Sequence, residues 1–311
     1  MRILTITLNP AIDQTITVDK FVSGKVHRAR SVRESPGGKG INSSSCLADW
    51  GIRTAAAGFL GRDNAGIFEK LFAAKGIEDR FLRLDGTPRV NIKVVDNNDT
   101  TEINLPGIEV SYRDIRDMSA LADEYLTVPG MAILSGSLPP GCPRDLYKTM
   151  TANLKARRCT VLLDADGAAL TESLSAALLP DCIKPNRQEL SQWAGRELTN
   201  HHEMIELVQD LRQRGLALGA ISLGDEGALF IGEETLHAFG DTDMLAGSVG
   251  AGDAMMAGIC AALHEGADPE RTARLGTAFA LARLSQRGPH LPEKEIVEKL
   301  AREVRITKIG K

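Results

Sequence analysis

Residues 247–258 read Gly-Ser-Val-Gly-Ala-Gly-Asp-Ala-Met-Met-Ala-Gly, a glycine-rich turn that runs into a carboxylate and then an apolar segment. This pattern predicts a helix that opens at Asp253, with small residues leaving its first N–H groups accessible to a ligand. Such N–H groups attract anions, phosphate among them. A carboxylate there would repel phosphate, so we interpret Asp253 as a base that takes a proton from an attacking hydroxyl. The pattern indicates a kinase, although an acidic first-turn residue is also a common stabilising feature.

The composition restricts the class of protein. A length of 311 residues permits one or two domains, and 43% hydrophobic with 25% charged residues is ordinary for a soluble globular protein. A net charge of −4 and only 4% aromatic residues argue against a nucleic-acid surface. The five cysteines include no Cys-x-x-Cys pair, which favours neither disulfides nor zinc and predicts a cytoplasmic protein. No stretch approaches the length of a membrane span, so no membrane partner is expected.

Short apolar segments alternate with longer amphipathic segments through most of the chain. Strands are expected at residues 3–8, 131–134, 160–163, 182–184, 220–223 and 228–231, and helices at 66–75, 145–157 and 202–214. This order predicts a mostly parallel sheet with helices on both faces. Ligands of such sheets bind beyond the carboxyl ends of the strands.

Two segments depart from that order. Residues 12–18 and 89–105 alternate between polar and apolar side chains, the second around a turn at 96–99. They predict a small antiparallel sheet with one polar and one apolar face. Because such a sheet cannot bury its apolar face alone, we expect a lid that also forms a dimer contact. An ordinary surface hairpin is the alternative.

A second glycine-rich segment reads Pro-Gly-Gly-Lys-Gly-Ile-Asn at residues 36–42. Its glycines allow the backbone and the Lys39 ammonium to approach a small anionic ligand, and Asn42 offers a donor and an acceptor to a hydroxyl. The sequence contains no Walker A loop, since Lys39 is followed by glycine. It also lacks a Gly-x-Gly-x-x-Gly after a strand, which argues against a dinucleotide-dependent dehydrogenase.

Six motifs follow one another along the chain: Asn-Pro-Ala-Ile-Asp at 9–13, Gly-Gly-Lys-Gly-Ile-Asn at 37–42, Ser-Gly-Ser-Leu-Pro at 135–139, Lys-Pro-Asn-x-x-Glu at 184–189, Ser-Leu-Gly at 222–224 and Ser-Val-Gly-Ala-Gly-Asp at 248–253. With them the chain resembles the ribokinase-like sugar kinases, in their phosphofructokinase-B branch, over essentially its whole length. The resemblance implies one kinase domain over residues 1–311, folded as a three-layer α/β sandwich with a mostly parallel sheet. The β lid would come from inserted segments at about 12–35 and 88–107.

The resemblance also implies roles for individual residues. Asp253 would be the base, and the N–H groups of Gly250, Ala251 and Gly252 would form an anion hole for the transferring phosphoryl group. The substrate-binding residues would be Asp13, Gly37, Gly38, Lys39, Asn42, Arg89 and Ser137. Of these, Lys39 and Arg89 would hold a phosphate already on the substrate, with help from Lys25 and Arg28 near the lid.

The nucleotide side follows from the same resemblance. ATP would contact Lys184, Asn186, Ser222, Gly224, Gly227 and Ser248, and Glu189 would position Mg²⁺, mainly through water. Ordinary structural roles stay open for three residues: Arg89 as a solvated strand charge, Glu189 as a first-turn helix acid and Ser137 as a turn residue. The sequence departs from the family pattern with Gly at 247, where a polar residue is expected, and Ser at 248, where Thr is usual.

The glycine–lysine motif resembles those of 1-phosphofructokinases and tagatose-6-phosphate kinases. Segments 58–64, 87–93 and 186–195 lean towards the former. The resemblance therefore predicts transfer of the γ-phosphoryl group of ATP to the 6-hydroxyl of fructose 1-phosphate, giving fructose 1,6-bisphosphate. The alternatives are a tagatose-6-phosphate kinase, a 6-phosphofructokinase of the same family, and a nucleotide-binding regulator that has lost catalysis. Such a regulator would have no need of Asp253 and Glu189, which are both present.

Overall fold

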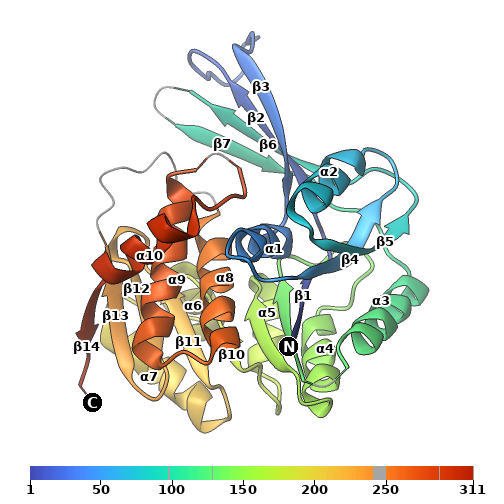
Figure 1. The fold of residues 1–311 in the computed structure, drawn as a ribbon. Coiled ribbons are helices and arrows are strands. Elements are labelled where there is room, and N and C mark those ends of the chain that lie inside the picture. Colours follow the sequence, from blue (N-terminus) through green and yellow to red (C-terminus); the bar gives the residue numbers. More distant parts are fainter. Residues whose placement is uncertain (97–98, 128, 241–249, 287, 311) are drawn as a thin grey trace.

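The computed structural model describes residues 1–96, 99–127, 129–240, 250–286 and 288–310. Its main body is built on one ten-stranded sheet (Figure 1). In spatial order the strands are β14 (Arg305–Lys308), β13 (Thr235–Phe239), β12 (Ala228–Ile231), β11 (Leu218–Ser222), β10 (Cys182–Ile183), β9 (Thr160–Asp164), β8 (Gly130–Ser135), β1 (Arg2–Thr7), β4 (Ala55–Gly61) and β5 (Glu78–Leu84). In this spatial order, every neighbouring pair from β11 to β5 is parallel, and the pairs from β14 to β11 are antiparallel. The predicted mostly parallel sheet is confirmed.

Helices cover both faces of this sheet, which explains why its central strands are apolar throughout. One face carries α3 (Tyr112–Tyr125), α4 (Leu146–Ala156), α5 (Gly167–Leu174), α6 (Arg187–Ala194) and α7 (His201–Gln213). The other carries α1 (Lys39–Asp49), α2 (Gly66–Lys75), α8 (Ala251–Glu265), α9 (Pro269–Leu284) and α10 (Lys294–Glu303). Successive residues of β1 enter opposite cores, Ile3 one and Leu4 the other, as the two-residue period of a strand requires. The result is the expected three-layer α/β sandwich.

A separate four-stranded sheet, called the small sheet below, projects from one side of the main body (Figure 1). Its order is β3 (Ser31–Gly37), β2 (Ala11–Thr17), β6 (Arg89–Val95) and β7 (Thr100–Asn104). The prediction of an antiparallel sheet is wrong at its centre, because β2 and β6 pair in parallel. The chain enters β2 from β1 and β6 from β5, and these two strands of the large sheet run in the same direction. Residues 97 and 98 of the expected turn lie outside the described residues.

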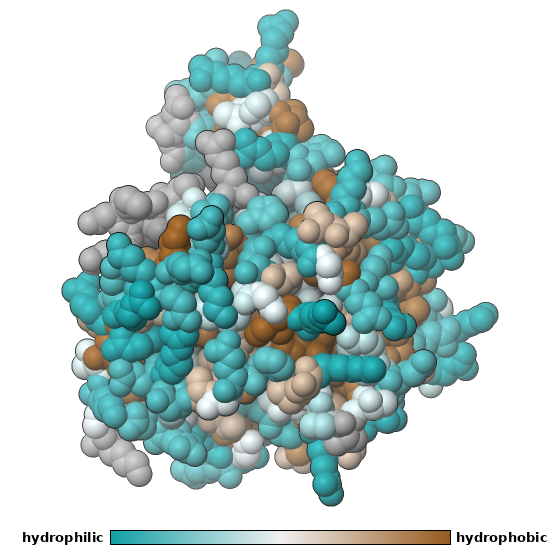
Figure 2. Space-filling model, in the orientation of Figure 1, coloured by the Kyte–Doolittle hydropathy of each residue, from teal (hydrophilic) through white to brown (hydrophobic). Residues whose placement is uncertain are grey.

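The face of the molecule drawn in Figure 2 is mostly polar. On the face drawn in Figure 2, hydrophilic side chains cover most of the main body, while apolar ones also appear on the projecting small sheet. Within the described ranges, no helix combines the length and the apolar character needed to cross a bilayer.

Candidate active site

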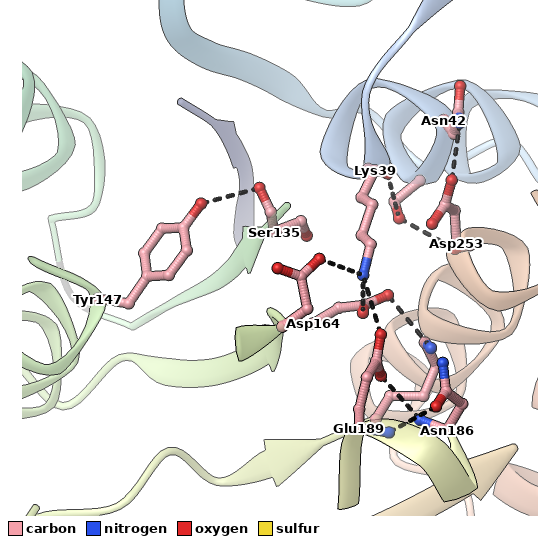
Figure 3. A network of polar contacts seen from close by, with 11 residues as sticks. Lys39, Asn42, Ser135, Tyr147, Asp164, Asn186, Glu189 and Asp253 are labelled. Carbon is pink, nitrogen blue, oxygen red and sulfur yellow. Dashed lines mark hydrogen bonds and ion pairs between the residues drawn. The ribbon is translucent and has the colours of Figure 1, made fainter. Parts of the chain in front are cut away.

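The predicted site residues gather where the parallel strands end and where α1 and α8 begin (Figure 3). Helix α8 begins at Ala251, two residues before the predicted start at Asp253. Gly250 caps the helix with φ of 84°, a left-handed conformation that glycine adopts without steric cost. Asp253 is therefore the third helical residue, and the unpaired N–H groups of the first turn surround it.

Asp253 is held by two residues of α1. Its side chain is 9% exposed, and its Oδ2 accepts a hydrogen bond of 2.7 Å from Nδ2 of Asn42. The hydroxyl of Ser43 donates to the backbone oxygen of Asp253 at 3.0 Å. These contacts bring the two glycine-rich segments of the sequence into one site.

Burial and the negative charge of Asp164 raise the pKa of Asp253, while the Asn42 hydrogen bond and the ammonium groups of Lys39 and Lys184 lower it, and the net result is a pKa of about 6. A carboxylate with such a pKa is ionised at neutral pH yet accepts a proton more readily than an ordinary aspartate. That is the property a general base needs.

Sequence reasoning missed Asp164, which joins two predicted site residues. Asp164 is the last residue of β9 and is 1% exposed. Its Oδ1 lies 3.0 Å from Nζ of Lys39 (Figure 3), and its Oδ2 lies 3.3 Å from Nζ of Lys184. Burial alone would raise the pKa of Asp164, but Lys184 and Lys39 outweigh it and hold this pKa below its usual value. Its position directly after the predicted strand 160–163 was an available signal, since ligands bind at strand ends.

Lys39 faces more than one carboxylate. Its Nζ lies 3.9 Å from Oδ2 of Asp166 and 3.9 Å from Oε1 of Glu189, in addition to its contact with Asp164. Burial lowers the pKa of Lys39, but Asp164, Glu189 and Asp253 together raise it above the ordinary lysine value. The ammonium therefore stays charged at any physiological pH.

A cleft of about 860 Å³, called the sugar cleft below because the sequence-predicted sugar contacts Asp13 and Asn42 line it, is also lined by Lys93. Oδ1 of Asp13 accepts a hydrogen bond of 3.0 Å from Nδ2 of Asn91, and its Oδ2 lies 4.0 Å from Nζ of Lys93. A Cβ on Gly37 would come within 2.6 Å of Oδ2 of Asp13, so a larger residue there would displace the Asp13 carboxylate. Gly38, with φ of 132°, is the N-cap of α1.

Arg89 and Ser137 line a neighbouring cleft of about 640 Å³, together with Arg144. Nε of Arg89 donates to the backbone oxygen of Asn9 at 3.2 Å, and Nδ2 of Asn9 donates to Oγ of Ser137 at 3.2 Å. Burial lowers the pKa of Arg89, against the opposing charges of Asp13 and Asp166. Arg89 is therefore within electrostatic range of Asp13, which lines the first cleft, and of Asp166, which lines the second.

Lys25 and Arg28, suggested as helpers, lie in the exposed segment between β2 and β3. In the described part of the chain, no side-chain hydrogen bond or ion pair links either residue to the site.

A pocket of about 460 Å³ lies on the other side of Gly252. Four of the residues expected to bind nucleotide line it, namely Asn186, Ser222, Gly224 and Gly227. The residues that sequence reasoning missed form its wall on α8 and α9: Met255, Thr277, Ala280, Leu281 and Leu284. No sequence signal distinguishes them from ordinary core positions of an amphipathic helix. Lys184 adjoins this pocket, since a Cβ on Gly252 would lie 3.1 Å from its Nζ. Ser248 lies outside the described residues.

Glu189 has a structural partner. Its backbone N–H donates to Oδ1 of Asn186 at 2.8 Å, and its Oε2 accepts from the backbone N–H of Asn186 at 2.8 Å, which makes a capping box at the start of α6. Its Oε1 faces Lys39 instead. Within the described residues, no cluster of three or more His, Cys, Asp or Glu side chains could hold a metal ion. Oε1 of Glu189, which lies 3.9 Å from the Lys39 ammonium, nevertheless suits Mg²⁺, which takes most of its ligands from water and phosphate.

Comparisons with known proteins agree on one family. The sequence profile described as "pfkB family carbohydrate kinase" matches residues 6–296. A 1-phosphofructokinase of Xanthomonas campestris pv. campestris is 45% identical over 290 residues, which cover 91% of this chain and 91% of that protein. The solved structure of a possible 1-phosphofructokinase from Thermotoga maritima covers 100% of both chains with a TM-score of 0.89 and 25% identity. Arabidopsis thaliana ribokinase, solved with ribose and ATP, has the same fold, covering 96% of this chain and 98% of that one with a TM-score of 0.77 and 19% identity.

Proposed function

The chain belongs to the pfkB family of carbohydrate kinases, and from this membership we propose that it transfers the γ-phosphoryl group of ATP to the 6-hydroxyl of fructose 1-phosphate. The product is fructose 1,6-bisphosphate. One observation supports this proposal above all: Asn42, which lines the sugar cleft, holds Asp253, whose neighbours Ala251 and Gly252 line the second pocket. The base thus stands between a polar cleft and a pocket with an apolar wall. The 45% identity with a 1-phosphofructokinase supports the choice of substrate.

The reaction assigns each of these groups a task. Asp253 takes the proton of the ketose hydroxyl, whose oxygen forms the new bond to the γ-phosphorus. The bond between that phosphorus and the bridging oxygen breaks, and its electron pair leaves with ADP. The N–H groups at Gly250, Ala251 and Gly252 stabilise the charge on the phosphoryl oxygens. Lys184, aligned by Asp164, adds positive charge at the same place.

The remaining residues follow from their positions. Asp13, Gly37, Gly38, Asn42 and Ser137 bind the sugar, and Lys39 with Arg89 hold the phosphate that it already carries. Lys184, Asn186, Ser222, Gly224, Gly227 and Ser248 bind ATP. Oε1 of Glu189 would hold Mg²⁺, which would supply positive charge against the ATP phosphates.

The alternative substrates would bind in the opposite orientation to fructose 1-phosphate. Tagatose 6-phosphate and fructose 6-phosphate carry their phosphate at the other end of the sugar, and would present the 1-hydroxyl to Asp253. We further infer a homodimer formed through the small sheet, acting as a lid over the sugar cleft. The expected compartment is the cytoplasm, on the cysteine pattern alone.

Coupled ADP release tests the proposal, with fructose 1-phosphate, fructose 6-phosphate, tagatose 6-phosphate and unphosphorylated fructose as acceptors. Fructose 1-phosphate is expected to give the highest kcat/KM, and Asp253→Asn to lose roughly three to five orders of magnitude. The matched control is Asp114→Asn, because Asp114 is also the third residue of a helix, α3, outside the site. Equal ADP release from wild type and Asp253→Asn would refute the assigned base.

A further inference from the structure

A buried cation lies beside the anion hole without a counter-ion among the described residues. Arg283, in the last turn of α9, is 9% exposed. Its Nη1 donates to the backbone oxygen of Gln286 at 2.9 Å. Its Nε is buried without a hydrogen-bond partner among the described residues, and none of the ion pairs found in that part of the chain includes it. A charge removed from water is costly unless a partner of opposite charge meets it.

The guanidinium lies directly against the start of α8. A Cβ built on Gly250 would come within 3.1 Å of Nε and 3.2 Å of Nη2 of Arg283. Arg283 also lines the sugar cleft with Asp13 and Asn42. The side chain therefore spans the short distance between the anion hole and the cleft where the attacking hydroxyl would lie.

The other cations of the site are already neutralised in part. Lys39 and Lys184 share the carboxylate of Asp164, at 3.0 and 3.3 Å. Burial lowers the pKa of Arg283, and the negative charge of Asp253 opposes this shift without forming an ion pair with it. Arg283 is thus a cation whose charge the surrounding described residues leave largely unmatched.

We propose that Arg283 is a catalytic residue whose guanidinium contacts the phosphoryl group while it passes from the nucleotide to the sugar. The proposal rests on the kinase function proposed above. The step is the one already described: the hydroxyl oxygen bonds to phosphorus, the bond to the bridging oxygen breaks with its electron pair going to ADP, and the proton goes to Asp253. Nε and Nη2 donate to oxygens of the phosphoryl group, whose charge the planar guanidinium can meet with two parallel hydrogen bonds.

Steady-state kinetics of Arg283→Met and Arg283→Lys, with ATP and fructose 1-phosphate, separate this role from a structural one. Removing one donor from an anion hole costs about 10²- to 10³-fold in kcat. Arg283→Met is expected to lose that much kcat with both KM values changed less than about threefold, and Arg283→Lys to recover at least about tenfold of it because it keeps the charge. The thermal midpoint of Arg283→Met should equal or exceed that of wild type, since an unmatched buried charge has been removed.

The control is Arg274→Met, on the same helix. Arg274 is bound to Glu270 and to the backbone oxygen of Val304, so its loss should lower the thermal midpoint and leave kcat unchanged. A kcat of Arg283→Met within about threefold of wild type would overturn the proposal, as would a fall in thermal midpoint with kcat intact. Failure of the wild type to release ADP with any phosphorylated ketose would instead overturn the proposed function itself.

Discussion

The side-chain amide of Asn42 donates a hydrogen bond of 2.7 Å to Oδ2 of Asp253, across 211 positions of the sequence. The same helix fixes the backbone of Asp253 through the hydroxyl of Ser43. One carboxylate oxygen is thereby occupied, while no described residue donates to Oδ1. In the proposed reaction, Oδ1 is therefore the oxygen that accepts the proton of the substrate hydroxyl.

The rate should depend on pH through Asp253. Only the ionised carboxylate accepts a proton, and its pKa is about 6. We therefore expect kcat/KM to rise with pH and to level off above that value. Asn42→Ala removes a hydrogen bond that lowers this pKa, and should move the midpoint of the profile to higher pH. Asn200→Ala, which removes the cap of α7 far from the site, should leave the midpoint in place. A profile flat from pH 5 to pH 8 would contradict the assignment.

Asp253→Asn should cost activity but not stability. The pKa of Asp253 is higher in the folded protein than the value of about 3.9 expected in the unfolded chain, so the native state binds this proton more tightly. The ionised carboxylate therefore destabilises the folded protein above about pH 6, and this destabilisation disappears as the pH falls towards the unfolded-state pKa. Since asparagine mimics the neutral form, the variant should melt a few degrees above wild type at pH 8 and close to it at pH 4.5. Differential scanning calorimetry at both pH values measures this, and a lower melting temperature at pH 8 would contradict it.

Asp164→Asn should damage both stability and activity. It leaves Lys39 and Lys184 facing a neutral group in a buried site, and breaking such a pair costs about 3–5 kcal/mol. The pKa of Asp164 is depressed, so its contribution is present above the unfolded-state value and is lost as the pH falls through the lower folded one.

The control for that variant is Asp166→Asn. Asp166 is 48% exposed and lies 3.9 Å from Nζ of Lys39, so its removal should change the free energy of unfolding by less than about 1 kcal/mol. Urea unfolding of both variants gives the comparison. Similar losses from the two substitutions would mean that Asp164 does not organise the lysines.

Glu189→Gln should separate the capping role of Glu189 from metal binding. Glutamine can still accept from the backbone N–H of Asn186, so the capping box and the melting temperature should survive. The Mg²⁺ concentration that gives half-maximal activity should rise about tenfold or more, because a neutral oxygen is a poorer ligand for this ion. Glu203→Gln alters a similar contact at the start of α7, where Glu203 accepts from the backbone N–H of Thr199, and should change neither quantity. An unchanged Mg²⁺ requirement in Glu189→Gln would mean that Glu189 caps α6 and does not bind the metal.

The small sheet should hold two copies of the chain together. Its register places Val32 beside Ile16, and Ile103 beside Ile92, on one apolar face, where Val32 is 56% and Ile103 is 50% exposed. Sedimentation is expected to give a dimer for wild type and a monomer for Val32→Glu. Tyr112→Glu, at an 83% exposed position on α3, is the control that should stay dimeric. A wild type that sediments as a monomer at micromolar concentration would refute the interface.

The sequence predicted apolar strands that contain β-branched residues, and missed β4 and β5, which contain none. Residues 131–134 and 160–163 became β8 and β9, because such runs fit a sheet buried on both faces. Strand β4 reads Ala-Ala-Ala-Gly-Phe-Leu-Gly and β5 reads Glu-Asp-Arg-Phe-Leu-Arg-Leu, so neither shows the β-branched alternation that marks a strand. Their places in the sheet come from tertiary packing.

The site divides in the same way. Motifs identified the turns at Gly38 and Gly250, because glycine with positive φ is a local requirement that the sequence must record. Arg283 belongs to no motif, and its significance depends on the packing of α9 against α8. Asp164 could have been found from its place at the end of a strand, but its pairing with two lysines exists only once β9, α1 and the segment after β10 are assembled.

Strand β3 continues without a loop into Gly38 and the first turn of α1, where Lys39 and Asn42 lie. A rigid tilt of the small sheet would therefore move that turn, and with it Asn42 and the Asp253 carboxylate to which Asn42 is hydrogen-bonded. A ligand that draws the sheet down over the cleft would reorient the proton acceptor in the same motion, so that closure and activation are one mechanical event.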